Sequence, residues 1–268
     1  MTFPEKPSVA YAAGVAEAKI ISVPNSAVVR QARNVIAGSD WRLDRGHAVI
    51  RFHPAYCHMQ PWVLAMLAAW AEEYRRTGGT IGVENAGRAA YGFRFGLADY
   101  LGIQNPSPVT EHEEAGRFVP LKRIRNSEDL SELLAQLVTL LHLSEEPEHA
   151  KAVLYAMSEM VRNTLEHSEA QAGAVVAAQL YAGARTSKTY VSIGIADCGV
   201  GIRSTIKRNY PKIRTHKEAL LKAIEPGATG AVQGEYGSAD NAGAGLFITR
   251  RVSSATRGYF GLASGDAL

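Results

Sequence analysis

The feature that most constrains this chain is an alternating strand that runs directly into a glycine-rich turn. In residues 190–195 every second residue is apolar, which is the pattern of a strand with one buried face. Asp197 follows at the expected strand end, and Gly199 and Gly201 leave no side chains in the way of a ligand. A carboxylate there can accept a hydrogen bond from an exocyclic amine. Asp-x-Gly-x-Gly is also a common turn sequence, so its meaning depends on other motifs.

Two further motifs flank this turn. Ser158–Ser168 lies upstream, within a helix expected over 148–167, and Asn241–Phe247 lies downstream and contains Gly-Ala-Gly. The three motifs, in this order, resemble the N box, G1 box and G2 box of the GHKL ATPase superfamily, which includes gyrase-type topoisomerases, sensor histidine kinases and anti-sigma serine kinases. The resemblance covers residues 127–263, about half of the chain.

The resemblance implies an α+β chain. Its ATP-binding part would be a two-layer α/β sandwich of the Bergerat type, in which helices cover a mixed sheet. The sequence between the first two motifs agrees, because strand-like runs over 173–181 and 189–196, joined by a polar loop, predict an antiparallel hairpin. A further helix is expected over 130–143, where Ser127 offers an N-cap.

The first motif places three polar residues along one edge of a helix. Glu159, Asn163 and His167 recur every four residues beside an apolar stripe. In the family, the residue that matches Asn163 binds the Mg²⁺ that bridges the phosphates, and an amide oxygen suits that ion. The residue that matches Glu159 is the catalytic general base in the hydrolytic and serine-kinase branches. His167 either contacts phosphate or fixes the helix end by a hydrogen bond.

These polar residues have a simpler interpretation as well: they could be polar edge residues of a packed helix.

The second motif, by resemblance, binds the adenine of ATP. Asp197 would accept the adenine amino group, Gly199 and Gly201 would let the base lie against the turn, and Ile202 would supply an apolar wall.

The third motif predicts a phosphate cradle. The backbone N–H groups of Gly243, Ala244, Gly245 and Leu246 precede or begin a helix expected over 246–253, where the helix dipole favours an anion. In the family, the interval between the second and third motifs is the ATP lid. Its glycines and cations suit hinge motion and a triphosphate, although an ordinary flexible loop with solvated cations has the same composition.

The N-terminal part alternates between strand and helix patterns. Strands over 47–52 and 80–84, an amphipathic helix over 61–76 and a second helix over 89–101 predict a small α/β layer. This layer loosely resembles the STAS-like domains that accompany some anti-sigma-type ATPases. A packing and dimerisation domain without a ligand is the alternative.

Three units follow from these patterns. We expect an N-terminal arm with several prolines over 1–25, the small α/β domain over 26–108, and the ATP-binding domain over 109–268. The boundary falls in a stretch of proline and acidic residues over 105–114. A strand is expected over 257–263. The family continues with one more strand there; in this chain we expect that strand to be either missing, supplied otherwise, or lost by truncation of the ATP-binding domain at its C-terminal strand.

Net charge, apolar runs and cysteine content argue against a nucleic-acid partner, a membrane span and a disulfide. A net charge of +3 over 268 residues is too small to indicate a nucleic-acid partner. No apolar run approaches the roughly 20 residues that cross a bilayer, and the pattern over residues 1–7 is not that of a signal peptide. Cys57 and Cys198 lie far apart, which favours reduced thiols and a cytoplasmic location.

The sequence therefore predicts a protein that binds ATP with Mg²⁺ and hydrolyses it slowly. Hydrolysis would drive a lid or switch a partner, which is either another protein or a second copy. An anti-sigma-type protein serine kinase is the alternative enzyme. A nucleotide-sensing scaffold without turnover is the alternative from another functional class.

Overall fold

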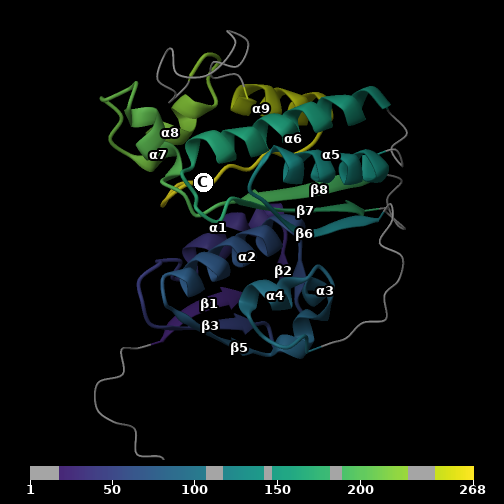
Figure 1. The fold of residues 1–268 in the computed structure, drawn as a ribbon, viewed down its shortest axis with the longest axis vertical. Coiled ribbons are helices and arrows are strands. Elements are labelled where there is room, and N and C mark those ends of the chain that lie inside the picture. The colour runs from purple at the N-terminus through teal and green to yellow at the C-terminus, as the bar shows by residue number, and fades with distance from the viewer. Residues whose placement is uncertain (1–17, 107–116, 142–146, 182–188, 229–244) are drawn as a thin grey trace, which may run out of the picture.

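The computed structural model describes residues 18–106, 117–141, 147–181, 189–228 and 245–268. These residues form a stack of alternating layers (Figure 1): a parallel three-stranded sheet, a layer of helices, an antiparallel three-stranded sheet and a second layer of helices. The fold is thus mixed α/β with one parallel and one antiparallel sheet, which agrees with the predicted α+β class.

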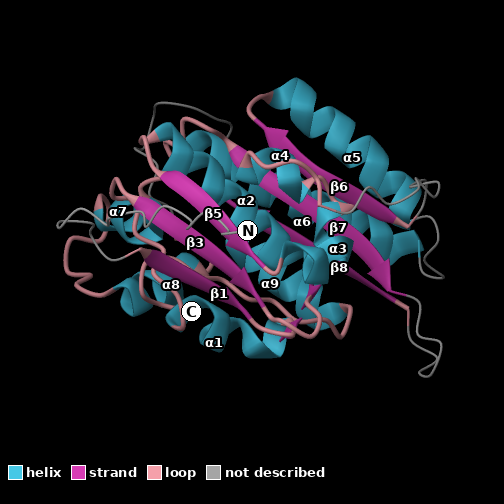
Figure 2. Ribbon diagram, turned by 90° about the horizontal axis from the view of Figure 1, so that it is seen from below, coloured by secondary structure: helices cyan, strands magenta, loops and turns pink. Residues whose placement is uncertain are grey.

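The parallel sheet belongs to the N-terminal part. It has the order β1 (Lys19–Val23), β3 (His47–Phe52) and β5 (Thr80–Glu84). Because the strands lie side by side in chain order and such crossovers are right-handed, the connecting helices α1 (Ala32–Ala37) and α2 (Pro61–Arg76) fall on the same face. In Figure 2 the sheet is seen from its other face, and no helix lies in front of it.

Two elements of this part differ from the prediction. β1 lies inside the expected N-terminal arm, and it is ordered because all five of its residues pair with β3. The helix expected over 89–101 is instead a 3₁₀ turn (Ala86–Ala89) followed by two short helices, α3 (Ala90–Phe93) and α4 (Leu97–Leu101). Gly96 separates α3 from α4 because its φ of 84° is left-handed and cannot continue a helix. A short parallel pair, β2 (Ser26–Ala27) with β4 (His58–Met59), completes this part.

The antiparallel sheet has the order β6 (Phe118–Ile124), β7 (Ala174–Tyr181) and β8 (Tyr190–Ala196). The predicted β7–β8 hairpin is confirmed. β6 was not predicted: Lys122 and Arg123 interrupt its apolar pattern, although Phe118, Val119, Leu121 and Ile124 are buried.

α2 lies between the two sheets. Eleven of its sixteen residues are buried, and it packs against β7 and β8 as well as against the parallel sheet. The predicted bounds of this amphipathic helix are confirmed, and because α2 is covered on two sides, its buried surface is wider than a single apolar stripe. The core beneath α2 is shared: Phe118 and Val175 of the antiparallel sheet belong to the same apolar cluster as Phe52 and Leu64.

The other face of the antiparallel sheet is covered by α5 (Ser127–Leu141) and α6 (Pro147–His167). Helix α9 (Gly245–Ala255) packs on α6, and α7 (Gly201–Lys207) packs on α8 (His216–Ala223). None of the helices described is long and apolar enough to cross a membrane.

The strand expected over 257–263 is absent, since the described residues after α9 make only an isolated bridge between Ser264 and Ala267. Side-chain contacts hold this C-terminal segment instead. The Ile202 N–H donates to Ser264 Oγ at 3.0 Å, and Arg30 donates to Tyr259 Oη at 2.9 Å. β8 therefore remains at the edge of the sheet as far as the structure describes it.

Candidate functional site

α6 carries the three polar residues of the first motif. Glu159 is buried, with 7% of its surface exposed, whereas Asn163 and His167 are half-buried. The Glu159 carboxylate forms an ion pair with Arg162 at 3.6 Å. Burial of Glu159 and partial burial of Asn163 place them against other protein elements rather than on a solvated face.

The element that covers them is the start of α9. A Cβ built on Gly245 would lie 2.5 Å from Asn163 Nδ2 and 3.4 Å from Glu159 Cβ, so a side chain at position 245 would require the Asn163 amide to move. Thr249, one turn further on, donates a hydrogen bond to the Ala156 carbonyl at 3.4 Å. The structure therefore brings the predicted Mg²⁺ ligand and the predicted base to the N-terminus of the predicted phosphate-binding helix.

The turn after β8 sits on the C-terminal end of α6. Asp197 Oδ1 accepts a hydrogen bond from the Gly199 N–H at 2.8 Å, which fixes the turn. A Cβ on Gly199 would lie within 3.0 Å of the Ser168 carbonyl, and the Val200 N–H donates to that carbonyl at 2.7 Å. This close approach explains the glycine at position 199 without reference to a ligand.

Asp197 is exposed to solvent but crowded by protein atoms. Desolvation raises the pKa of this carboxyl above its ordinary value of 3.8, and the hydrogen bond from Gly199 partly opposes that shift. Its second oxygen accepts no hydrogen bond from the described residues, so an amine donor could reach it. Burial together with the nearby charge of Asp197 raises the pKa of the Cys198 thiol to about 12, so this thiol stays protonated at neutral pH.

The remaining residues of the second motif start α7. Gly201 has a φ of 77°, which favours glycine, and Ile202 is half-buried with its N–H on Ser264 Oγ. The His167 ring lies 3.9 Å from the Glu166 carboxylate, while its backbone carbonyl accepts a hydrogen bond from Thr205 at 3.4 Å. The contact that joins His167 to α7 is thus made by its backbone.

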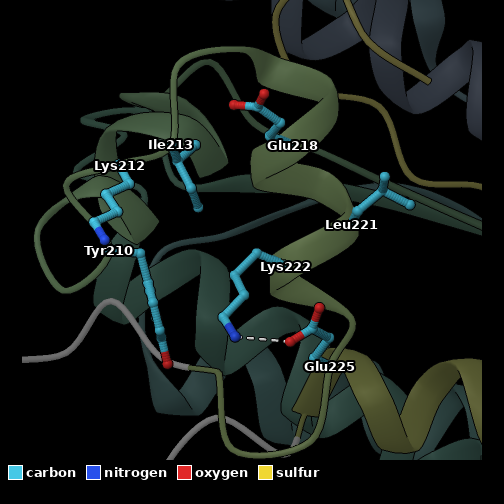
Figure 3. A pocket seen from close by; sticks show the side chains of 7 residues that line it. All are labelled: Tyr210, Lys212, Ile213, Glu218, Leu221, Lys222 and Glu225. Carbon is cyan, nitrogen blue, oxygen red and sulfur yellow. Dashed lines mark hydrogen bonds and ion pairs between the residues drawn. The ribbon is translucent and has the colours of Figure 1, made fainter.

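Gly243 and Ala244 lie outside the described residues, as does most of the predicted lid. Leu246 is half-buried in the first turn of α9. Two open hollows in the described surface lie elsewhere, and neither is lined by Asp197 or Asn163. One of them, with a volume of about 370 Å³, lies between α8 and the residues before it, where the Tyr210 ring lies under the Lys222–Glu225 ion pair (Figure 3).

Two contacts near the site escaped the sequence analysis. Ser264 anchors the start of α7, and no local pattern marks it. A Cβ on Gly194 would lie within 3.0 Å of the Trp62 backbone, so β8 touches the first turn of α2 directly. A glycine inside a strand often marks such a close approach, and this signal was present in the sequence.

Comparisons with protein families, with curated proteins and with solved structures give no match. The chemistry of the site therefore rests on its own residues. Asp197 offers a carboxylate acceptor at the C-terminal end of α6. Asn163 offers an amide and Glu159 a buried carboxylate, and both lie under the N-terminus of α9, nearer the middle of α6.

Proposed function

We propose that residues 117–268 form a Bergerat-type unit of the GHKL kind, which binds Mg-ATP between the turn after β8 and the start of α9. The contact of Gly245 with Asn163 carries this proposal, because it joins two motifs that are 82 residues apart in the chain. The contacts of Gly245 with Asn163 and of Gly199 with Ser168 are five residues apart on α6, or about 8 Å along the helix axis. One nucleotide can therefore reach both.

The adenine would bind at Asp197. Its free carboxylate oxygen can accept the exocyclic amine, and Ile202 is a half-buried apolar residue at the end of the same turn. The protein atoms that crowd Asp197 support this role, because they reduce the competition of water for a hydrogen bond to its carboxylate.

The phosphates would lie at the N-terminus of α9. Asn163 fits the magnesium ion because its half-buried amide lies beside Gly245 and offers the oxygen that Mg²⁺ prefers. When bound, the ion would neutralise phosphate charge. Glu159 would be the general base, since it lies on the same helix face as Asn163, one turn away.

Binding without turnover is the second candidate, because the Glu159 carboxylate already pairs with Arg162. A serine kinase would need a protein substrate. The N-terminal part is poorly suited to that role, since α2 is buried against the antiparallel sheet.

Calorimetric titration with ATP tests binding. We expect Asp197→Ala to weaken affinity at least about tenfold, because the adenine amine loses its acceptor. Asn163→Ala should abolish the gain in affinity that Mg²⁺ gives the wild type. Asp99→Ala, which removes an exposed carboxylate of α4, is the control. Wild-type affinity in Asp197→Ala would rule out the proposed adenine site.

Measurements of ATP turnover distinguish the candidate functions, which are an ATPase, a nucleotide-binding scaffold and a protein kinase. If Glu159 is the base, Glu159→Gln should lower phosphate release about a hundredfold and leave ATP affinity unchanged. No release from the wild type, with binding intact, would identify the scaffold. Transfer of labelled γ-phosphate to protein would identify the kinase.

A further inference from the structure

A second hollow lies between α8, α9 and the C-terminal segment. It is open to solvent and has a volume of about 350 Å³. Its wall is mostly apolar: Leu220, Leu221 and Ile224 come from the α8 end, and Phe260 and Leu262 come from the C-terminal segment. This hollow lies on the opposite half of α9 from Gly245 and includes no residue assigned above to nucleotide binding.

Both charged side chains among the described residues that line this hollow are cations. Lys217 on α8 and Arg250 on α9 are exposed and form no ion pair with a described residue. They belong to a wider concentration of positive charge. Residues 201–228 contain seven lysines or arginines and two glutamates, and residues 245–263 contain three arginines and no acidic residue. The whole chain carries only +3, so these two segments are far more positive than the rest of the sequence.

Leu221 stands between the two hollows and lines both of them. It is 55% exposed, and Figure 3 shows it on α8, apart from the Lys222–Glu225 pair. A single exposed leucine is unremarkable on a protein surface. Here it continues an apolar wall whose rim is cationic, and this combination specifies a ligand that is both apolar and acidic.

We propose that the hollow between α8 and α9 is a docking site for an acidic peptide segment of a protein partner. Apolar side chains of that segment would fill the wall around Leu221, and its carboxylates would pair with Lys217 and Arg250. Charge complementarity selects an acidic partner. The aliphatic wall selects a peptide over a nucleic acid, because single strands bind through phosphate contacts and stacked aromatic side chains, and Phe260 is the one aromatic residue of the lining among those described.

Docking at this position does not require nucleotide. The site would nevertheless be linked to the proposed phosphate end, because α9 begins beside Asn163 and reaches the hollow with Arg250. A bound peptide would contact α9, the helix that begins at Gly245.

The test is a selection of random sixteen-residue peptides, displayed on phage, against the full chain without nucleotide. We expect enriched sequences to be rich in Asp and Glu, with Leu, Ile or Phe at helical spacing. The affinity of a labelled selected peptide is then measured by fluorescence anisotropy. The variant Lys217→Glu/Arg250→Glu should weaken it at least about tenfold, and Leu221→Ser about fivefold.

Arg88→Glu is the matched control, because Arg88 is an exposed cation on the N-terminal part, and its variant should bind like the wild type. Circular dichroism confirms that each variant is folded. Several results would overturn the proposal: no enrichment, enriched sequences that are not acidic, or unchanged affinity in the double variant. A labelled single-stranded oligonucleotide that binds more tightly than any selected peptide and loses affinity in the same double variant would assign this face to nucleic acid instead.

Discussion

Asp197 combines a ligand-accessible position with an electrostatic cost. Desolvation raises its pKa above 3.8, so the folded state binds this proton more tightly than the unfolded chain does. The contribution of the Asp197 carboxyl to folding stability is therefore complete below pH 3.8, where it is protonated in both the folded and the unfolded chain. This contribution is lost as the pH rises through the higher pKa of the folded state. At neutral pH the protein retains a carboxylate that opposes folding, as expected for a binding group.

Asp197→Asn tests this cost. The amide oxygen can still accept from Gly199, and the charge is gone. We expect the melting temperature of the variant to equal or exceed that of the wild type at neutral pH, with the difference vanishing below 3.8. Thermal melts across this pH range measure it. A variant that is less stable at neutral pH would show that the charge stabilises the turn.

Gly245→Ala tests the contact between the third motif, at Gly245, and the first motif, at Asn163. The new methyl group would lie 2.5 Å from Asn163 Nδ2, so the amide must move away from α9. We expect ATP affinity in the presence of Mg²⁺ to fall about tenfold, because one ligand position is lost, whereas Mg²⁺-free affinity changes little. Titrations with and without Mg²⁺ measure both values.

Gly87→Ala is the control for that substitution, since a Cβ there meets no atom within 4 Å and φ is ordinary. An equal loss with and without Mg²⁺ in Gly245→Ala would indicate general disruption of α9 and would contradict the specific role of Asn163.

Local patterns were enough to locate several residues of the candidate site. Helical periodicity placed Glu159 and Asn163 on one face, and strand alternation placed Asp197 at a strand end. The contact of Ser264 with Ile202 was unpredictable, because it joins residues 62 positions apart through a side-chain oxygen. The burial of Glu159 was equally hidden, since it depends on where α9 packs.

Among the elements, β8 and α2 make a close backbone contact between the N-terminal part and the rest. Gly194→Ala would place a methyl group within 3.0 Å of the Trp62 backbone, and neither a backbone nor a buried helix end can move aside cheaply. We expect unfolding free energy to fall by about 1–3 kcal/mol. Urea denaturation measures the shift in midpoint, and Gly87→Ala again serves as the control. An unshifted midpoint would mean that α2 does not rest on β8.

Elements were predictable where one pattern dominated. The bounds of α2, β3 and β5 were predicted because an apolar run or a strict alternation defines each of them. The burial of α2 on two sides was missed, although its buried alanines and Trp70 leave no broad polar face. The pattern over 257–263 predicted a strand, but strands need a paired neighbour, and the described residues give this segment none.

On the scale of the whole molecule, the two predicted domains are in close contact within the described residues. They share an apolar core beneath α2, and polar contacts cross between them: Arg123 donates to Glu72 at 2.9 Å, and the Leu121 N–H donates to the Phe95 carbonyl at 2.9 Å. Most of the acidic linker that suggested a boundary, predicted over 105–114, lies outside the described ranges, which end at 106 and resume at 117. Composition alone predicts a linker but not how much surface the flanking parts bury against each other.

This shared core predicts a single unfolding transition. All three tryptophans, Trp41, Trp62 and Trp70, lie in the N-terminal part, so tryptophan fluorescence reports on that part and, through Trp62, on its contact with β8. Far-UV circular dichroism reports on all helices, including α5, α6 and α9. If α2 must lose both of its covering sheets together, urea curves from the two probes should coincide, with one midpoint and one slope. Separate midpoints would show that the N-terminal part unfolds independently, and Gly194→Ala should then leave the second transition unmoved. Coincident curves that shift together in that variant would place the cooperative unit across both sheets.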